Sequence, residues 1–137
     1  MLVREGMSKT VLTVGPGQQL RDVAKQMTER RVGAAIVVDP DAPGPGIITE
    51  RDILRAYAAD RITGEEPVSQ HSTERAVFAS PDWSLEQAAD EMVRGNFRHL
   101  IVIDGATVVG VLSMRDIVSS WVRDGATSEV PGPPAAS

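Results

Sequence analysis

The chain has 137 residues, enough for one ordinary domain or two small ones, and its 42% hydrophobic and 24% charged content is that of a soluble globular protein. It lacks an apolar run of membrane-spanning length and a basic-then-apolar leader, and it has no cysteine for disulfides, thiolate nucleophiles or cysteine-ligated zinc. A net charge of -5 without a block of Lys or Arg disfavours nucleic-acid binding. We therefore expect a cytoplasmic protein that binds neither nucleic acid nor membrane.

The sequence contains an internal duplication. A shift of 65 positions superimposes Pro16 on Pro81, Leu20 on Leu85, Ala24 on Ala89, Met27 on Met92, Ile36 on Ile101, Val37 on Val102 and Asp39 on Asp104. Beyond a turn that is one residue longer in the first copy, the offset is 64 and matches Gly46 to Gly110, Arg51 to Arg115, Asp52 to Asp116 and Ile53 to Ile117. We interpret the chain as repeat 1 (1–65), repeat 2 (66–123) and a disordered tail (124–137) rich in Gly, Pro, Ala and Ser.

The predicted elements follow one another in the same order in both repeats. In the first, residues 20–27 carry the apolar stripe of an amphipathic helix, 36–38 and 46–48 predict two paired strands, and 53–58 predict a second helix. The corresponding segments of the second repeat are 85–92, 101–103, 108–112 and 117–122. With a strand ahead of the first helix, each repeat is of the α/β class with the order strand, helix, strand, strand, helix. Because so small a unit exposes much of its surface, we expect the two repeats to pack sheet to sheet with pseudo-twofold symmetry.

A phrase of the form G-x-x-[ST]-x-x-D recurs in register, once at Gly46–Asp52 and again at Gly110–Asp116. Together with the duplication and the order of elements, it resembles the tandem CBS domain pair, or Bateman module, from Val3 to Val122. The resemblance implies two clefts between the repeats that bind AMP, ADP, ATP and sometimes NAD or S-adenosylmethionine. It also implies that the Asp of each phrase holds ribose hydroxyls and that the Ser or Thr lies by ribose and phosphate.

This sequence departs from the family pattern in two places. Ile36 and Ile101 stand where the family usually has proline in the second strand. A basic pair that in the family faces the phosphates occurs only in the second repeat, as Arg98-His99, against Gly33-Ala34 in the first.

The polar residues of the phrases can also be interpreted as purely structural. Thr49 with Asp52, and Ser113 with Asp116, also fit a capping box at the start of a helix, which needs no ligand. The two interpretations are compatible.

The arginines of the phrases are stronger indicators of an anionic ligand than these capping residues. Arg51 and Arg115 lie in the first turn of a helix, where the macrodipole disfavours a cation, and a phosphate held by the guanidinium and the helix-start amides would compensate. A surface ion pair with Glu50 or Asp52 is the alternative, and His99 alone would more often be structural.

The two candidate clefts draw on both repeats. The first is expected to hold Thr49, Asp52, Arg98, His99 and Arg115, and is the favoured site. The second is expected to hold Ser113, Asp116 and Arg51, with apolar walls from Val14 and from the 32–34 segment that includes Ala34.

The leading hypothesis is a regulatory, nucleotide-sensing module that requires no cofactor, catalyses nothing and acts on an unknown protein effector. The alternative is a ligand-independent CBS scaffold or interaction module, and a small hydrolase or transferase has no motif in its favour. His71 and His99 are too few to specify a metal site. Because Tyr57 and Trp121 exceed what two small repeats need to bury, we also expect a homodimer.

Overall fold

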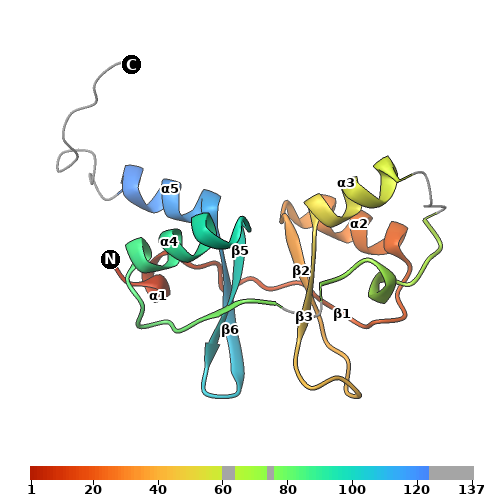
Figure 1. Cartoon of the computed structure of the whole chain (residues 1–137), viewed down its shortest axis with the longest axis horizontal. Coiled ribbons are helices and arrows are strands. Elements are labelled where there is room, and N and C mark those ends of the chain that lie inside the picture. Colours follow the sequence, from red (N-terminus) through yellow and green to blue (C-terminus); the bar gives the residue numbers. More distant parts are fainter. Residues whose placement is uncertain (60–63, 74–75, 124–137) are drawn as a thin grey trace, which may run out of the picture. The chain divides into compact units, whose positions relative to one another are not determined.

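The computed structural model describes residues 1–59, 64–73 and 76–123, so the predicted tail at 124–137 lies outside the described residues. In chain order the elements are α1 (Val3–Gly6), β1 (Thr13–Val14), α2 (Leu20–Arg30), β2 (Ala34–Val37), β3 (Gly46–Thr49), α3 (Glu50–Ala58), the 3-10 helix η1 (Val68–Gln70), β4 (Phe78–Ala79), α4 (Leu85–Gly95), β5 (His99–Asp104), β6 (Thr107–Ser113) and α5 (Met114–Arg123). They form two compact units (Figure 1). The β1–β3 unit comprises Val11–Ala76, and the β4–β6 unit comprises Met1–Thr10 with the chain from Val77 onward.

The β1–β3 unit is a three-stranded sheet with two helices on one face. Strand β2 is central, parallel to β1 and antiparallel to β3. The predicted stripe of α2 is buried against the sheet, and the helix ends at Arg31, which adopts the left-handed conformation with φ of 57°. The helix-facing core consists of Leu12, Val14, Leu20, Val23, Met27, Ala35, Val37, Ile48, Ala56 and Val68.

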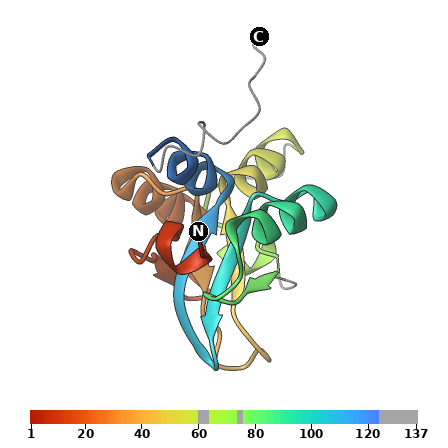
Figure 2. The same ribbon diagram turned by 90° about the vertical axis from the view of Figure 1, so that its left-hand side faces the viewer.

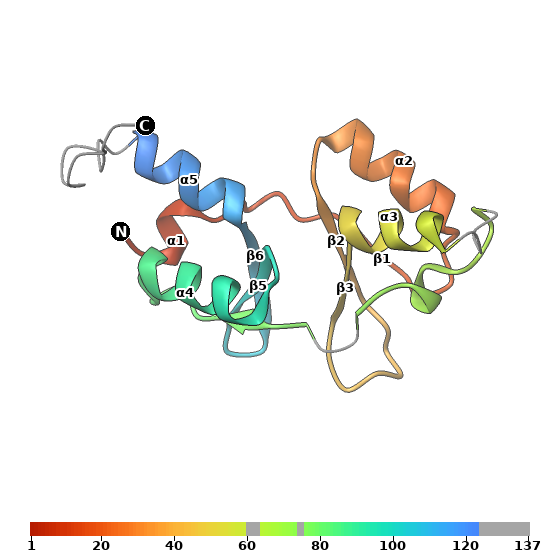
Figure 3. The same cartoon turned by 45° about the horizontal axis from the view of Figure 1, so that its top comes forward.

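The β4–β6 unit repeats this plan. Strand β5 is central, parallel to β4 and antiparallel to β6, and α4 and α5 contact each other and lie on the same side of the sheet (Figure 3). Its core consists of Val3, Ala79, Leu85, Ala88, Met92, Leu100, Val102, Leu112 and Ile117. Both units therefore show the predicted order of strand, helix, strand, strand, helix, which confirms the α/β class.

The central strands are apolar on both faces. Ala35 and Val37 face the helices, whereas Ile36, which lies between them, is fully buried without belonging to that core. Ile101 has the same environment in β5. This pattern is typical of a strand buried on both sides. The predicted packing of one sheet on the other stays a prediction, because each unit is described by itself.

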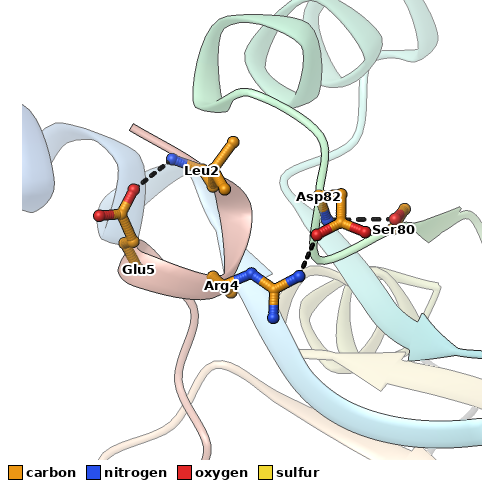
Figure 4. A network of polar contacts seen from close by, with 5 residues as sticks. All are labelled: Leu2, Arg4, Glu5, Ser80 and Asp82. Carbon is orange, nitrogen blue, oxygen red and sulfur yellow. Dashed lines mark hydrogen bonds and ion pairs between the residues drawn. The ribbon is translucent and has the colours of Figure 1, made fainter.

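The N-terminal segment of the chain belongs to the unit built from the second repeat. Helix α1 contacts α4 and α5 (Figure 2), and Val3 is fully buried in their core. The Val3 amide donates to the Trp83 carbonyl at 2.8 Å, and Arg4 forms an ion pair with Asp82 (Figure 4). Ser8 then pairs with Val111 at the free edge of β6 through two backbone hydrogen bonds of 2.9 and 3.0 Å.

The segment that opens the second repeat makes the equivalent contacts in the β1–β3 unit. Val68, 65 positions after Val3, is fully buried in that core, and its amide donates to the Gln18 carbonyl at 2.7 Å. Thr73, 65 positions after Ser8, pairs with Ile47 at the free edge of β3. The segment before β1 thus completes the β4–β6 unit, and the segment before β4 completes the β1–β3 unit.

This edge pairing explains the glycine that opens each G-x-x-[ST]-x-x-D phrase. A Cβ atom on Gly110 would lie 2.7 Å from the Ser8 carbonyl oxygen, and one on Gly46 would lie 3.1 Å from the Thr73 carbonyl oxygen. A side chain at Gly110 would force the added segment to shift, and one at Gly46 would require the Thr73 backbone to give by a few tenths of an ångström, so both glycines favour the edge pairing independently of any ligand.

The exchange of segments predicts where an N-terminal mutation acts. Val3→Ala should lower the free energy of unfolding by about 2 kcal/mol, because it removes two methyl groups from a filled core. Amide hydrogen exchange followed by mass spectrometry should speed up in residues 77–123 more than in residues 11–59. Val38→Ala, at an exposed valine, is the matched control. Faster exchange mainly in 11–59 would contradict the assignment of this segment.

Candidate functional site

The first phrase forms a tight corner between β3 and α3. Thr49 ends the strand and caps the helix, and its Oγ1 accepts a hydrogen bond from the Asp52 amide at 3.2 Å. In return, Asp52 Oδ2 accepts from the Thr49 amide at 2.9 Å and from the Thr49 hydroxyl at 3.0 Å. The predicted capping box is therefore present, and it fixes both side chains at the carboxyl end of β3.

The second phrase forms the same corner between β6 and α5. The Asp116 amide donates to Ser113 Oγ at 3.0 Å, and the Ser113 amide donates to Asp116 Oδ2 at 2.9 Å. All four capping side chains are half-buried. Each corner thus presents a carboxylate whose position is set by the helix start, and whose capacity for about four hydrogen bonds exceeds what the cap uses.

The first amides of both helices are partly used by the protein itself. The Glu50 amide donates to the Gly33 carbonyl and the Met114 amide donates to the Arg98 carbonyl, both at 2.9 Å. Because the third amide of each helix serves the cap, two of the first three donors already have partners. A phosphate at either corner would therefore depend on arginine side chains more than on helix amides. The sequence alone did not reveal that these amides already have acceptors.

The basic residues predicted for the site differ in exposure. Arg98 and Arg115 are exposed and form no salt bridge with any described residue, which removes the ion-pair alternative for Arg115 within that part of the chain. His99 is half-buried and lies opposite Ser113 in the β5–β6 register. Arg51, also half-buried, has an interaction partner of its own. The β4–β6 unit thus brings Arg98 and His99 to the Ser113 end of its sheet.

The apolar residues predicted as walls lie at different ends of β2. Ala34 is opposite Thr49, so it lies beside the first corner. Val14 pairs with Val37 at the other end of the strand and points into the helix-facing core, where it is 3% exposed. Ala34, but not Val14, therefore lies beside the Thr49–Asp52 corner of its own unit, and the predicted role of these residues as walls of the Asp116 cleft stays a prediction.

A second concave surface was not anticipated from the sequence. A groove of about 400 Å³ is lined by residues of α2 and α3. It is lined by Leu20, Arg21, Ala24, Lys25, Thr28, Glu29, Ile53, Tyr57 and Gly64. Of its lining residues, Tyr57 was singled out in the sequence, where it was interpreted as part of a dimer interface.

Two further features were sought among the described residues. No cluster of three or more His, Asp or Glu side chains that could hold a metal ion occurs in ranges 1–59, 64–73 and 76–123. Within the same ranges, the helices are too short and too polar to cross a membrane.

Comparison with known proteins identifies the family. The sequence model of the CBS domain matches residues 3–59 and again residues 68–123, so the chain belongs to the CBS domain family and carries two copies of the domain. It is 32% identical over 115 residues to the CBS domain-containing protein YhcV of Bacillus subtilis, covering 84% of this chain and 81% of YhcV.

Other relatives extend the comparison. The chain is 36% identical over 104 residues to CBSCBSPB5 of Arabidopsis thaliana, which is 75% of this chain and only 19% of that longer protein. The fold is similar to the CBS domain protein PAE2072 of Pyrobaculum aerophilum, solved with AMP, at a TM-score of 0.76 and 28% identity, over 90% of this chain and 99% of that one. The tandem CBS fold predicted from the sequence is thereby confirmed.

The capping geometry predicts a measurable contribution to stability. Ser113→Ala should lower the free energy of unfolding by about 1 kcal/mol, because the Asp116 amide loses its acceptor at the helix start. Urea denaturation followed by circular dichroism measures the change. Ser119→Ala, at an exposed position of the same helix, is the matched control and should change stability little. Equal stabilities of the two variants would show that Ser113 does not cap α5.

Proposed function

We propose that this protein is a regulatory module that binds an adenosine-containing ligand in the cleft between its two CBS repeats and catalyses no reaction. The observation that carries the proposal is the pair of matching corners, each with a fixed carboxylate and hydroxyl at a strand-to-helix junction. The AMP complex of PAE2072, a protein 28% identical to this chain, supports the choice of ligand class.

The chemistry of the corners suits a nucleoside. Asp52 and Asp116 can accept hydrogen bonds from the two hydroxyls of a ribose, because an ionised carboxylate is an acceptor with several lone pairs. Their orientation is set before the ligand arrives, so little conformational entropy is lost on binding. The exposed guanidinium of Arg115 or Arg98 would then form a charge-assisted hydrogen bond with phosphate. A ribose with attached phosphate matches both the carboxylate and the guanidinium groups, whereas a free base has neither the neighbouring hydroxyls nor the phosphate.

The two clefts should not be equal. We assign the stronger one to Thr49, Asp52, Arg98, His99 and Arg115, since the basic pair Arg98-His99 has only Gly33-Ala34 as its counterpart. We assign the weaker one to Ser113, Asp116 and Arg51, with Ala34 preferred over Val14 as its apolar wall because Val14 is 3% exposed and belongs to the helix-facing core. AMP, ADP and ATP are the first candidates, with NAD and S-adenosylmethionine as further ones.

The proposed regulatory role extends beyond the ligand. Occupancy would alter the shape or the association of the module, and a protein effector would respond to that change in the cytoplasm. No cofactor is needed for this role. We further propose that the protein is a homodimer, because large apolar side chains remain exposed on the helices of both units.

A ligand-independent scaffold is the second candidate, and two features of the sequence favour it. Isoleucines at 36 and 101 replace the usual prolines, and the first repeat lacks the basic pair. Such changes would be tolerated if the clefts had lost their ligand while the fold was retained.

A panel of ligands separates the two candidates. An adenosine-containing ligand that binds only the folded protein should raise the melting temperature, since at one hundred times its Kd it adds about 2.7 kcal/mol of stability. The panel consists of AMP, ADP, ATP, NAD, NADH and S-adenosylmethionine, and guanosine counterparts should have smaller effects. No shift with any member at millimolar concentration would favour the scaffold.

Titration calorimetry with three variants tests the assignment of the clefts. Asp52→Ala should abolish most AMP binding, whereas Asp116→Ala should leave the tighter phase largely intact. Arg98→Ala should weaken AMP by about 1.5 to 3 kcal/mol and adenosine far less, because only AMP offers a charged acceptor.

Asp104→Ala, at an exposed carboxylate on the hairpin between β5 and β6, is the control that should bind as wild type does. Each variant needs a check of folding, because a lost cap of about 1 kcal/mol could imitate a binding defect. Equal losses from Asp52→Ala and Asp116→Ala, or wild-type AMP binding by Arg98→Ala, would show that the clefts are assigned wrongly.

A further inference from the structure

One aromatic side chain lies on the edge strand of the β4–β6 unit. Phe78 is the first residue of β4 and is 39% exposed. It is the only Phe, Tyr or Trp on a strand of the described residues. Its neighbour Ala79 belongs to the helix-facing core. Because alternate residues of a strand point to opposite faces, Phe78 lies on the sheet face away from α4 and α5, which we call the outer face.

His99, a residue of the candidate site, shares the outer face with Phe78. Its neighbour Leu100 is in the helix-facing core, so His99 points to the opposite side of β5. The register partner of Phe78 is Ile101, two residues after His99. The backbones of Phe78 and His99 are therefore roughly 8 Å apart, by one strand spacing across the sheet and two residues along it. Diagonal neighbours at this separation are within reach of aromatic side chains, so both rings belong to one surface.

The outer face continues to the second corner. Ser113 lies opposite His99 on β6, and it points to the outer face because Leu112 before it belongs to the core. The chain then turns into α5 at the cap that Ser113 forms with Asp116. The three strands of the β4–β6 unit thus carry an aromatic ring, an imidazole and a hydroxyl on one face, near the end of the sheet where α5 begins.

The first repeat has neither ring. Thr13, 65 positions before Phe78, is the equivalent exposed residue of β1. Ala34, 65 positions before His99, is the equivalent residue of β2. The repeat that carries the basic pair therefore also carries the aromatic ring, on the same unit. A single exposed apolar side chain needs no explanation on a protein surface, but a ring placed beside the basic pair indicates a ligand with a flat aromatic part.

We propose that Phe78 stacks on the base of the nucleotide in the stronger cleft, to which His99 is assigned. This inference rests on the proposed function and accounts for the part of the ligand that the corners leave without a partner. The carboxylates accept from ribose and the guanidinium groups donate to phosphate, but neither group recognises an apolar ring. A phenyl ring does, because a base and an aromatic side chain attract each other through their flat faces.

Stacking also sets a limit on what Phe78 contributes. Every base has a flat face, so the contact adds affinity for adenine and guanine alike. Discrimination between the two bases then requires groups that reach their polar edges. Phe78 therefore raises the affinity of the stronger cleft for nucleotides as a class.

Titration calorimetry with variants of Phe78 tests the contact. Phe78→Ala should weaken AMP and adenosine by the same factor, roughly tenfold, because both carry the base. Arg98→Ala, in contrast, is expected to affect AMP far more than adenosine. Phe78→Tyr keeps the ring and should bind within about twofold of wild type. Thr13→Ala, at the equivalent exposed position of the other repeat, is the matched control and should leave the tighter phase unchanged.

Phe78→Leu separates stacking from simple apolar packing. Leucine keeps much of the apolar surface but has no flat face, so the affinity of this variant should lie closer to that of Phe78→Ala than to that of wild type. Wild-type affinity in Phe78→Leu would overturn the stacking. A loss in Phe78→Ala for AMP that adenosine does not share would overturn it as well, since the base is common to both. Melting temperatures establish that each variant is folded.

Fluorescence provides a test that does not depend on removing the ring. Phe78→Trp places an indole where the base is proposed to stack, and a stacked base quenches indole emission. Saturating AMP should lower the emission of this variant well beyond the change in wild type, whose own tryptophans are Trp83 and Trp121. Thr13→Trp should show no additional quenching when the tighter phase is saturated. A Phe78→Trp protein that binds AMP with only the wild-type change in emission would contradict the proposal.

These outcomes separate the stacking from the proposed function. AMP binding by the wild-type protein together with unchanged affinity in Phe78→Ala would overturn the stacking and leave the nucleotide site intact. Failure of every adenosine-containing ligand of the panel to bind the wild-type protein would overturn both.

Discussion

The burial of Val3 and Val68 determines how the two repeats become two compact units. Each of these valines opens its own repeat in the sequence, yet each is fully buried in the core formed by the other repeat's strands and helices. Four residues after the edge pairing of Ser8 with Val111, Leu12 is already in the other unit, where its carbonyl accepts from the Ile36 amide. The core of the β4–β6 unit is incomplete without Met1–Thr10, which is separated from the rest of that unit by the whole β1–β3 unit, whereas the β1–β3 unit, Val11–Ala76, is contiguous in the sequence.

The same constraint reaches the candidate site. The strands that carry the two phrases are held at their free edges by the exchanged segments, and the glycines that begin the phrases allow that close approach. Three residues later, each strand ends at the hydroxyl that caps the next helix. The capping role and the proposed ligand-binding role are therefore compatible for Thr49, Asp52, Ser113 and Asp116. The cap orients the carboxylate that the proposed ribose contact needs.

Local patterns in the sequence were sufficient for the four long helices, the paired strands and the corners, but not for α1 or η1. The i, i+3, i+4, i+7 stripe at residues 20–27 predicted α2, and the spacing of Thr49 and Asp52 predicted a capping box that the structure contains. Long-range features were not accessible in this way. The destination of the segment around Val3 depends on packing against residues some 80 positions away, and no periodicity reveals it. Val14 was expected to be an apolar wall of the second cleft, but it is 3% exposed and belongs to the helix-facing core, because alternate residues of a strand point to opposite faces. The sequence also did not show that the first amides of α3 and α5 donate to the carbonyls of Gly33 and Arg98. Every residue has a backbone carbonyl, so the residue type does not reveal which carbonyl accepts.

The central claim is that the two strand-to-helix corners hold an adenosine ligand. Titration of AMP into ¹⁵N-labelled protein, followed by two-dimensional NMR, tests it residue by residue. The account predicts that the largest amide shifts fall in the segments Gly46–Ile53 and Gly110–Ile117 and at Arg98 and His99, with little change on the outward faces of α2 and α4. Absence of shifts at millimolar AMP, or shifts confined to the helical faces, would contradict it.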